Sequence, residues 1–278
     1  MEALPSGATD PRAALEAVGA LPDTEIDLAA AAVQLARIDA PEADWRGAME
    51  TLSAIARDAV LLADPGSGPG RGEALAALLG GHWGFAGDRA AYDHPDNANL
   101  IRVLERKRGL PVALGIVWLH AATASGWPAH GIDFPAHFLL GLEASPPVVL
   151  DVFDGGTRLE APALRALLKR IEGPAAELRP GLLRPMGPRA VLLRLANNLK
   201  LRRQAAGDLP GALACVADML RIAPDHAALW REAGLMHQRL DQVAAALRCL
   251  DRFLALVPEG AVAERTRATV AELRARLN

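Results

Sequence analysis

Cysteine and the aromatic residues are scarce in this chain. Its 278 residues include two cysteines, Cys215 and Cys249, and only 4% aromatic residues, with a single tyrosine. Two cysteines without a pairing pattern or a metal-ligand spacing are typical of a reducing compartment and exclude a disulfide-rich fold. Alanine and leucine dominate the 51% of residues that are hydrophobic. Because these residues favour helices, we expect a mostly helical protein.

The chain also has no excess of basic residues, no secretory signal and no long apolar run. A formal net charge of −3 argues against a nucleic-acid partner. The first residues, Met1 to Pro5, have neither the basic start nor the apolar segment of a signal peptide. No apolar run approaches the roughly 18 residues that a membrane-spanning helix needs. We therefore expect a cytoplasmic protein that binds neither nucleic acid nor membrane.

The first hundred residues alternate between helical patterns and turn residues. Apolar residues recur at helical spacing from Ile26 to Ile38 and again from Trp45 to Ala63. The Pro- and Gly-rich segment from Asp64 to Gly72 is expected to be a surface loop, after which a helix resumes. A short helix is expected from Asn97 to Lys107, with Asp93 or Asn97 as its N-cap.

The middle of the chain predicts a buried helix followed by a small sheet. Residues 112–125 are apolar on nearly every face of a helix, which is typical of a helix at the centre of a domain. Strands are expected over 129–132, 138–142 and 148–153, the last ending at an Asp-Gly-Gly turn. The first domain is therefore expected to be helices packed on a small antiparallel sheet.

The last ninety residues repeat with a period of 34, which is the tetratricopeptide period and predicts pairs of antiparallel helices. The matched positions are Ala212 and Ala246, Leu213 and Leu247, Cys215 and Cys249, Leu220 and Leu254, and Pro224 and Pro258. The two cysteines therefore occupy equivalent packing positions, and residues 262–277 suit a capping helix. Two repeats and a cap are few for a free array, so we expect them to pack on the first domain.

These patterns predict an α+β, mostly helical protein in four segments. Residues 1–24 form a partly mobile N-terminal segment, and residues 25–172 form the first domain. Residues 173–188 are a linker, and residues 189–278 hold two tetratricopeptide-like repeats and a capping helix.

Three residues of the first domain, Pro111, His137 and Asp151, stand in an informative order. Pro111 opens the buried helix and precedes by fifteen residues the Gly126-Trp127-Pro128 turn. This arrangement resembles the Cys-His-Asp core of the transglutaminase-like superfamily, which is papain-like. The resemblance implies that Pro111 stands where that superfamily has its nucleophilic cysteine.

A second resemblance covers nearly the whole chain from about residue 26. It rests on Gly84-Phe85-Ala86-Gly87, Tyr92-Asp93-His94-Pro95, Asn97-Ala98-Asn99-Leu100, Val103-Leu104-Glu105-Arg106, Arg108-Gly109-Leu110-Pro111 and Pro135-Ala136-His137-Phe138-Leu139. These segments look like bacterial SirB-type proteins, which join a transglutaminase-like domain to tetratricopeptide repeats. The resemblance implies that proline generally replaces the cysteine and that the family's label is tied to regulation of a neighbouring gene. This chain departs at Ala113, where relatives often have a hydroxyl residue, and at Val152, where they often have proline.

The chemistry at these three positions is incomplete. Acyl transfer of this type needs a thiolate activated by an imidazole, and proline offers neither sulfur nor oxygen, although it suits the first turn of a helix. His137 and Asp151 then have two interpretations. They form a buried structural pair, or His137 acts as a general base on water in a hydrolase or amidase. We favour a pseudoenzyme.

No cofactor or metal is expected, because His130 and His137 lack the spacing of metal ligands on one helix turn. Binding candidates remain. Arg106 and Arg108, just before Pro111, can hold an anionic group, and Tyr92 and His130 can line the cleft. Lys200 and Arg203 belong to a basic patch that suits an acidic peptide. We therefore expect a protein-interaction or regulatory module whose repeats bind a protein or peptide partner.

Overall fold

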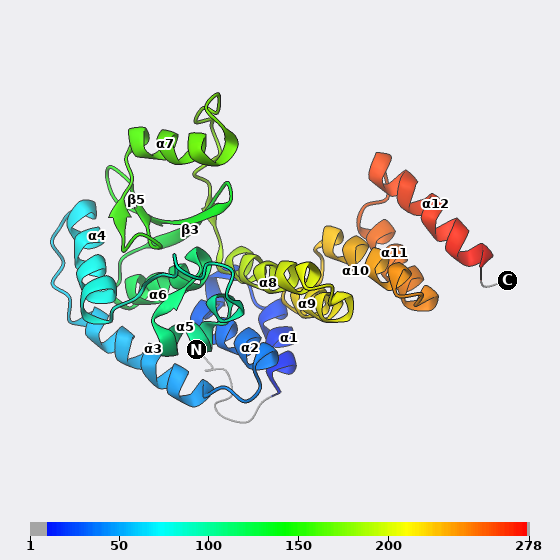
Figure 1. Ribbon diagram of the computed structural model, residues 1–278, viewed down its shortest axis with the longest axis horizontal. Coiled ribbons are helices and arrows are strands. Elements are labelled where there is room, and N and C mark those ends of the chain that lie inside the picture. Colours follow the sequence, from blue (N-terminus) through cyan, green and yellow to red (C-terminus); the bar gives the residue numbers. More distant parts are fainter. Residues whose placement is uncertain (1–9, 277–278) are drawn as a thin grey trace. The chain divides into compact units, whose positions relative to one another are not determined.

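The computed structural model describes residues 10–276, and these divide into two compact units (Figure 1). The larger unit comprises residues 21–195. The repeat unit combines residues 196–276 with residues 10–20 from the opposite end of the chain. The segment boundaries expected from the sequence, at residues 25, 173 and 189, remain predictions.

The larger unit is built around helix α6 (Pro111–Ala124), which is buried along nearly its whole length. The apolar pattern of residues 112–125 is confirmed by this burial, and Pro111 occupies the first turn, where its missing N–H costs no hydrogen bond. The helices that contact α6 are α2 (Leu28–Asp39), α3 (Trp45–Val60), α4 (Gly68–Ala76) and α5 (Leu100–Arg106). Helix α7 (Ala161–Glu172) packs instead on Ile132, Phe134 and Leu139 of the sheet.

A five-stranded antiparallel sheet packs on α6, with strand order β6-β5-β4-β3-β7. Its strands are β3 (Ala129–Phe134), β4 (His137–Leu142), β5 (Val148–Asp151), β6 (Thr157–Arg158) and β7 (Pro185–Met186). A separate parallel pair joins β1 (Ala86–Gly87) to β2 (Arg108–Gly109). The expected α+β fold with a small antiparallel sheet is confirmed. The expected linker contributes its own edge strand, β7, which pairs with β3.

The expected loop from Asp64 to Gly72 is wrong in its second half, because α4 begins at Gly68. Ser67 caps this helix by accepting a hydrogen bond from the Gly70 N–H at 3.3 Å. Gly68 lies against Ala144, and Gly72 lies against Leu150, with little or no room for a Cβ. The glycines therefore serve close packing of the helix on the sheet and not a flexible turn.

The expected N-cap of α5 is also wrong. A 3₁₀ turn over Pro95–Ala98 precedes the helix and moves the capping position to Asn99. The Asn99 side chain accepts from the N–H groups of Ile101 and Arg102 at 3.1 and 3.3 Å. Its amide also donates to Ala36 O, at the end of α2, at 3.0 Å. One buried asparagine thus caps α5 and joins it to α2.

The repeat unit contains the expected antiparallel helix pairs. Its elements are the C-terminal part of α8 (Pro188–Ala205), then α9 (Leu209–Ile222), α10 (Ala227–Arg239), α11 (Val243–Leu256) and α12 (Ala261–Ala275). Helix α1 (Pro11–Ala20) packs on α9, where Gly19 contacts the carbonyl of Arg221. Arg12 of α1 pairs with the buried Asp218 of α9 at 3.0 Å. Residues 10–20 thus form part of this unit.

Within residues 10–276, helices with the length and hydropathy needed to cross a membrane are absent.

Candidate functional site

His137 and Asp151 form a hydrogen-bonded pair across neighbouring strands. His137 begins β4 and Asp151 ends β5, and His137 Nε2 lies 3.0 Å from Asp151 Oδ1. Their side chains are only 14% and 13% exposed. The same carboxylate oxygen accepts from the backbone N–H groups of Phe153 and Asp154 at 3.0 and 3.3 Å. The turn after β5 therefore holds the carboxylate in place, as buried polar groups require.

The direction of this contact determines what the imidazole can do. Because Asp151 accepts at Nε2, the neutral ring carries its proton there and leaves Nδ1 as an acceptor. The His137 carbonyl is also held, since Arg194 donates to it at 2.7 Å, and Arg194 pairs with Asp133 of β3. The imidazole is thus oriented in the way that a general base requires.

Pro111 lies on the face of α6 that packs against β4. Gly115 follows Pro111 by one helical turn, so both lie on the same face, and the Phe138 ring packs directly on Gly115. Phe138 is the neighbour of His137 in β4. The buried position that the resemblance assigns to the nucleophile holds a side chain without a nucleophilic atom.

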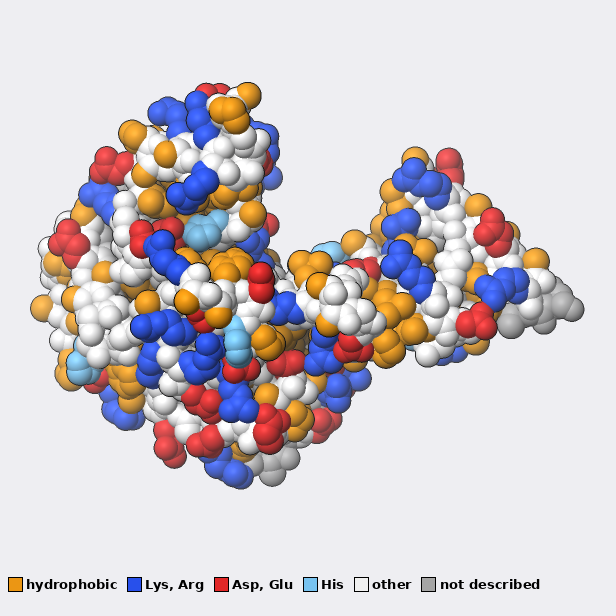
Figure 2. All heavy atoms as spheres, viewed as in Figure 1, with side chains coloured by type: hydrophobic (Ala, Val, Ile, Leu, Met, Phe, Trp, Pro, Cys, Tyr) orange, Lys and Arg blue, Asp and Glu red, His pale blue; other side chains and the backbone are white. Residues whose placement is uncertain are grey.

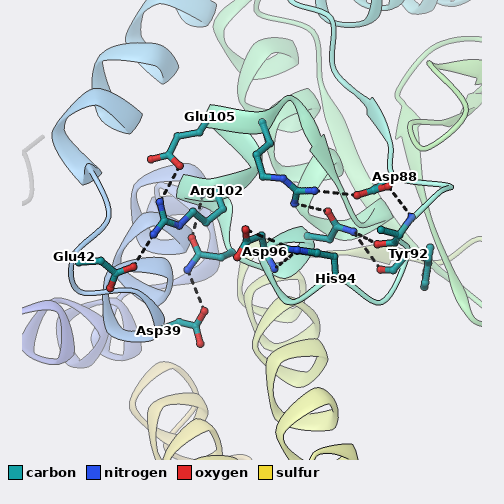
Figure 3. A network of polar contacts seen from close by, with 12 residues as sticks. Asp39, Glu42, Asp88, Tyr92, His94, Asp96, Arg102 and Glu105 are labelled. Atoms are coloured by element: carbon teal, nitrogen blue, oxygen red, sulfur yellow. Dashed lines mark hydrogen bonds and ion pairs between the residues drawn. The ribbon is translucent and has the colours of Figure 1, made fainter.

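The loop before α5 is held by a polar network that Figure 3 shows. Asn97 is fully buried, and its amide donates to the carbonyls of Ala91 and Tyr92 at 2.7 and 3.3 Å. Arg106 donates to Asn97 Oδ1 at 2.9 Å and to Asp88 Oδ2 at 3.1 Å. The Ala91 N–H donates to Asp88 and, with Arg106 and Asn97, lowers the pKa of that carboxyl. Arg106, expected to bind an anion, is therefore engaged in holding this loop.

Tyr92 borders the His137 pair through an aromatic contact. Its ring, in a residue that is 44% exposed, stands 5.7 Å from the Phe153 ring in an edge-on arrangement. Phe153 in turn lies 6.3 Å from the His137 imidazole. The loop fixed by Asn97 and Arg106 thus places the chain's one tyrosine beside the candidate site.

His130 is not brought together with His137. In the β3–β4 hairpin His130 lies opposite Gly141 near one end, whereas His137 lies opposite Phe134 at the other. The His130 Nδ1 atom is 3.7 Å from Glu143 and is buried without a hydrogen-bond partner in the described residues. Arg108 is exposed and donates through Nη1 to the carbonyls of Gly84 and Lys107 at 2.8 and 2.9 Å.

The basic residues expected to form a patch on the first repeat differ in exposure. Lys200 is almost fully buried, and its ammonium donates to Glu232 of α10 at 2.6 Å. Arg203 lies 3.5 Å from Asp208. Lys200 therefore ties two helices of the repeat unit together, and the expectation that it contributes to an exposed basic patch is wrong.

A groove in the repeat unit is the feature that the sequence did not indicate. It has a volume of about 830 Å³ and is lined by small apolar residues of α1 and α9 together with residues of α10 and α11. Its walls include Gly19, Leu213, Ala217, Trp230 and Cys249. Figure 2 shows hydrophobic side chains on the visible face of this unit, near α9 to α11.

Most polar groups at the groove already have partners. Arg221 pairs with Glu16 and with Asp218, the Trp230 indole donates to the Pro224 carbonyl at 2.7 Å, and His237 contacts Gln242 at 2.6 Å. Burial raises the pKa of the Cys249 thiol, which keeps it protonated. The groove therefore presents a mainly apolar surface, although the buried Nε atom of Arg221 makes no hydrogen bond in the described residues.

Comparison with protein families agrees with this architecture. A model of the transglutaminase-like superfamily matches residues 43–197, more than half of the chain, and a tetratricopeptide repeat model matches residues 199–276. The first match contains His137, Asp151 and Pro111, and the second contains α9 to α12.

Individual relatives extend over most of the sequence. A UPF0162 protein of Vibrio cholerae is 32% identical over 86% of this chain and 89% of its own length. Protein SirB1 of Salmonella typhimurium is 29% identical over 71% of this chain and 74% of its own length. Among solved structures, a crystal structure of menin aligns with 89% of this chain and 70% of its own, at 11% identity and a TM-score of 0.43. This last similarity is too low to carry an argument. The chain belongs to the transglutaminase-like superfamily, in the family of the UPF0162 and SirB1 proteins, with tetratricopeptide repeats following the transglutaminase-like domain.

Proposed function

We propose that the protein is a non-catalytic member of its superfamily, a cytoplasmic interaction or regulatory module that binds a partner protein through the repeat unit. The observation that carries the proposal is the apolar groove of about 830 Å³ among α1, α9, α10 and α11. Clefts of this size and polarity are typical of binding sites.

The chemistry of the groove suggests what the partner presents. Because Arg221, Trp230 and His237 already have internal partners, a charged segment would gain little there and would lose its hydration. The apolar face of an amphipathic helix, by contrast, would bury its side chains against Leu213, Ala217 and Trp230. We therefore expect a helical partner segment and not the acidic peptide that the sequence suggested.

The test fills the groove without disturbing the core. Ala217 is exposed on α9 and lines the groove, so Ala217→Arg places a long charged side chain in it. We expect partners that co-purify with tagged wild-type protein from its own host to lose at least about 10-fold in recovery, since about 1.4 kcal/mol of lost affinity suffices. Ala268→Arg, on an exposed face of α12 outside the groove, is the matched control.

His137→Ala separates the groove from the candidate site. If the partner binds both wild type and His137→Ala but not Ala217→Arg, the repeat unit is the binding module. Loss of the partner in a folded His137→Ala variant, with Ala217→Arg unaffected, would assign binding to the larger unit and contradict the proposal.

A second function is favoured by one specific observation, the oriented imidazole of His137 with its Nδ1 acceptor. A hydrolase or amidase could use it to deprotonate water directly, with Asp151 stabilising the imidazolium. Turnover of a peptide or amide that disappears in His137→Ala, while the free energy of unfolding stays within about 0.5 kcal/mol of wild type, would favour this function over the first.

A further inference from the structure

The chain uses lysine at only three positions. Lys107, Lys169 and Lys200 are its lysines, and the other 27 of its 30 basic residues are arginine. Lys169 pairs with Glu177 at 3.2 Å, and Lys200 pairs with Glu232 at 2.6 Å. Lys107 differs, because in the described residues it has no carboxylate within ion-pair distance and its ammonium contacts aromatic rings.

The surroundings of Lys107 hold its amine in a partly buried site. The ammonium lies 4.9 Å from the centroid of Trp83 and 4.6 Å from that of Phe85. Its backbone ends α5 in the left-handed region, with φ of 57°. Glycine is the usual residue there because a Cβ costs about 1 kcal/mol or more.

A second cation, Arg108, is anchored at the backbone of this lysine. Arg108 donates through Nη1 to the carbonyls of Lys107 and Gly84, which anchors the guanidinium at the backbone of the lysine. The side chain is exposed, and these two contacts engage one of its three nitrogens. Arginine presents five N–H donors in a planar fork that suits a phosphate group.

We propose that Lys107 is an acylation site for small acyl phosphates, with Arg108 holding the phosphate. In the reaction the uncharged Nζ attacks the acyl carbon and forms the amide bond. The bond between that carbon and the bridging oxygen breaks, and its electron pair leaves with inorganic phosphate. The proton released by the nitrogen passes to phosphate or water, so no oxidant or reductant is needed.

The three lysines differ in what holds the charged form of the amine, which must lose a proton before it reacts. The amine is the nucleophile, and it must be deprotonated before it attacks. Burial lowers the pKa of Lys107, which increases its uncharged fraction at neutral pH. Lys169 and Lys200 must instead give up a carboxylate partner when they lose a proton. The rings of Trp83 and Phe85 hold an ammonium less strongly than a carboxylate does.

Mass spectrometry of the full-length protein tests the proposal. After incubation with acetyl phosphate, digestion at glutamate gives the acetylated fraction at each lysine over time. We expect Lys107 to react at least about 10-fold faster than Lys169 or Lys200, because each of those amines must give up a carboxylate partner before it can attack. Comparable rates at all three lysines would overturn the proposal.

The role of Arg108 is tested by changing the charge of the reagent. Arg108→Gln is expected to slow acetylation of Lys107 by acetyl phosphate about 10-fold, as the loss of a charge-assisted hydrogen bond does. The same variant should react normally with an uncharged N-hydroxysuccinimide ester of acetate. Arg165→Gln, an exposed change on α7, is the control. Equal slowing with both reagents would overturn the assignment of the phosphate to Arg108.

Discussion

The central helices of the two units differ in how completely they are buried. In the larger unit α6 is buried along nearly its whole length, and the side chains of Asn97 and His137 hydrogen-bond within the unit. In the repeat unit α9 buries only one face and leaves Ala214 and Ala217 exposed beside an apolar groove. A side chain surrounded by protein is available only for stability, whereas an open apolar surface is available to a partner. Binding is therefore expected at the repeats.

Trp118 and Trp230 give the most direct comparison of the two units. Trp118 is fully buried in α6, so Trp118→Ala is expected to cost about 3–5 kcal/mol of unfolding free energy through the cavity it leaves. Trp230 is half-buried at the groove, and Trp230→Ala should cost about 1 kcal/mol, mainly its hydrogen bond. Urea denaturation of both variants measures the difference.

Trp118→Phe is the control for Trp118→Ala, because it keeps an aromatic ring in the site and removes the indole N–H. The indole N–H of Trp118 is buried without a hydrogen-bond partner in the described residues, so removing it should recover part of the lost stability. Equal costs for Trp118→Ala and Trp230→Ala would contradict the contrast between a closed and an open unit.

Asn97 tests whether the polar network of the larger unit is structural. Asn97→Ala removes two donated hydrogen bonds and leaves Arg106 without one of its acceptors, for an expected loss of about 2–3 kcal/mol. Asp96→Ala changes the partly exposed neighbouring residue and should cost less than about 0.5 kcal/mol. Amide hydrogen exchange in residues 88–99 should rise in the first variant only.

The His137–Asp151 pair is expected to have a moderate effect. If the pair is structural, His137→Ala should lower the unfolding free energy by roughly 1–3 kcal/mol, because Asp151 remains buried without this partner. The double variant with Asp151→Ala should then cost less than the sum of the two single changes. Additive costs would indicate that the two side chains are not energetically coupled and would contradict a structural role for the pair.

The smallest effect is expected at the start of α4. A hydrogen bond from Arg71 and a second from the Gly66 N–H lower the pKa of Asp64 from 3.8 to about 2. A carboxylate whose pKa is lowered by folding stabilises the folded state at pH values above its unfolded-state pKa. This stabilisation disappears as the pH falls to its folded-state pKa. The urea midpoints of wild type and Asp64→Asn should therefore converge between about pH 4 and pH 2. A difference that stays constant over this range would exclude the ion pair as its cause.

The sequence predicted those elements whose signal is local. The apolar run of α6, the short strands β3 and β4 and the 34-residue period all depend on residues close together in the chain. The order of Pro111, His137 and Asp151 also predicted the family. The errors lie where packing changes the role of a residue. Gly68 and Gly72 were expected in a loop because the sequence does not show that they face Ala144 and Leu150.

By itself the sequence thus determined a mostly helical α+β protein with tetratricopeptide repeats, because periodicity records which face of each element is buried. Only the tertiary structure decided that α1 joins the repeat unit, that a groove opens there, and that Arg106 and Lys200 are engaged internally. Each of these depends on contacts between residues tens to hundreds of positions apart. Such contacts form when whole elements pack, and no local pattern encodes them.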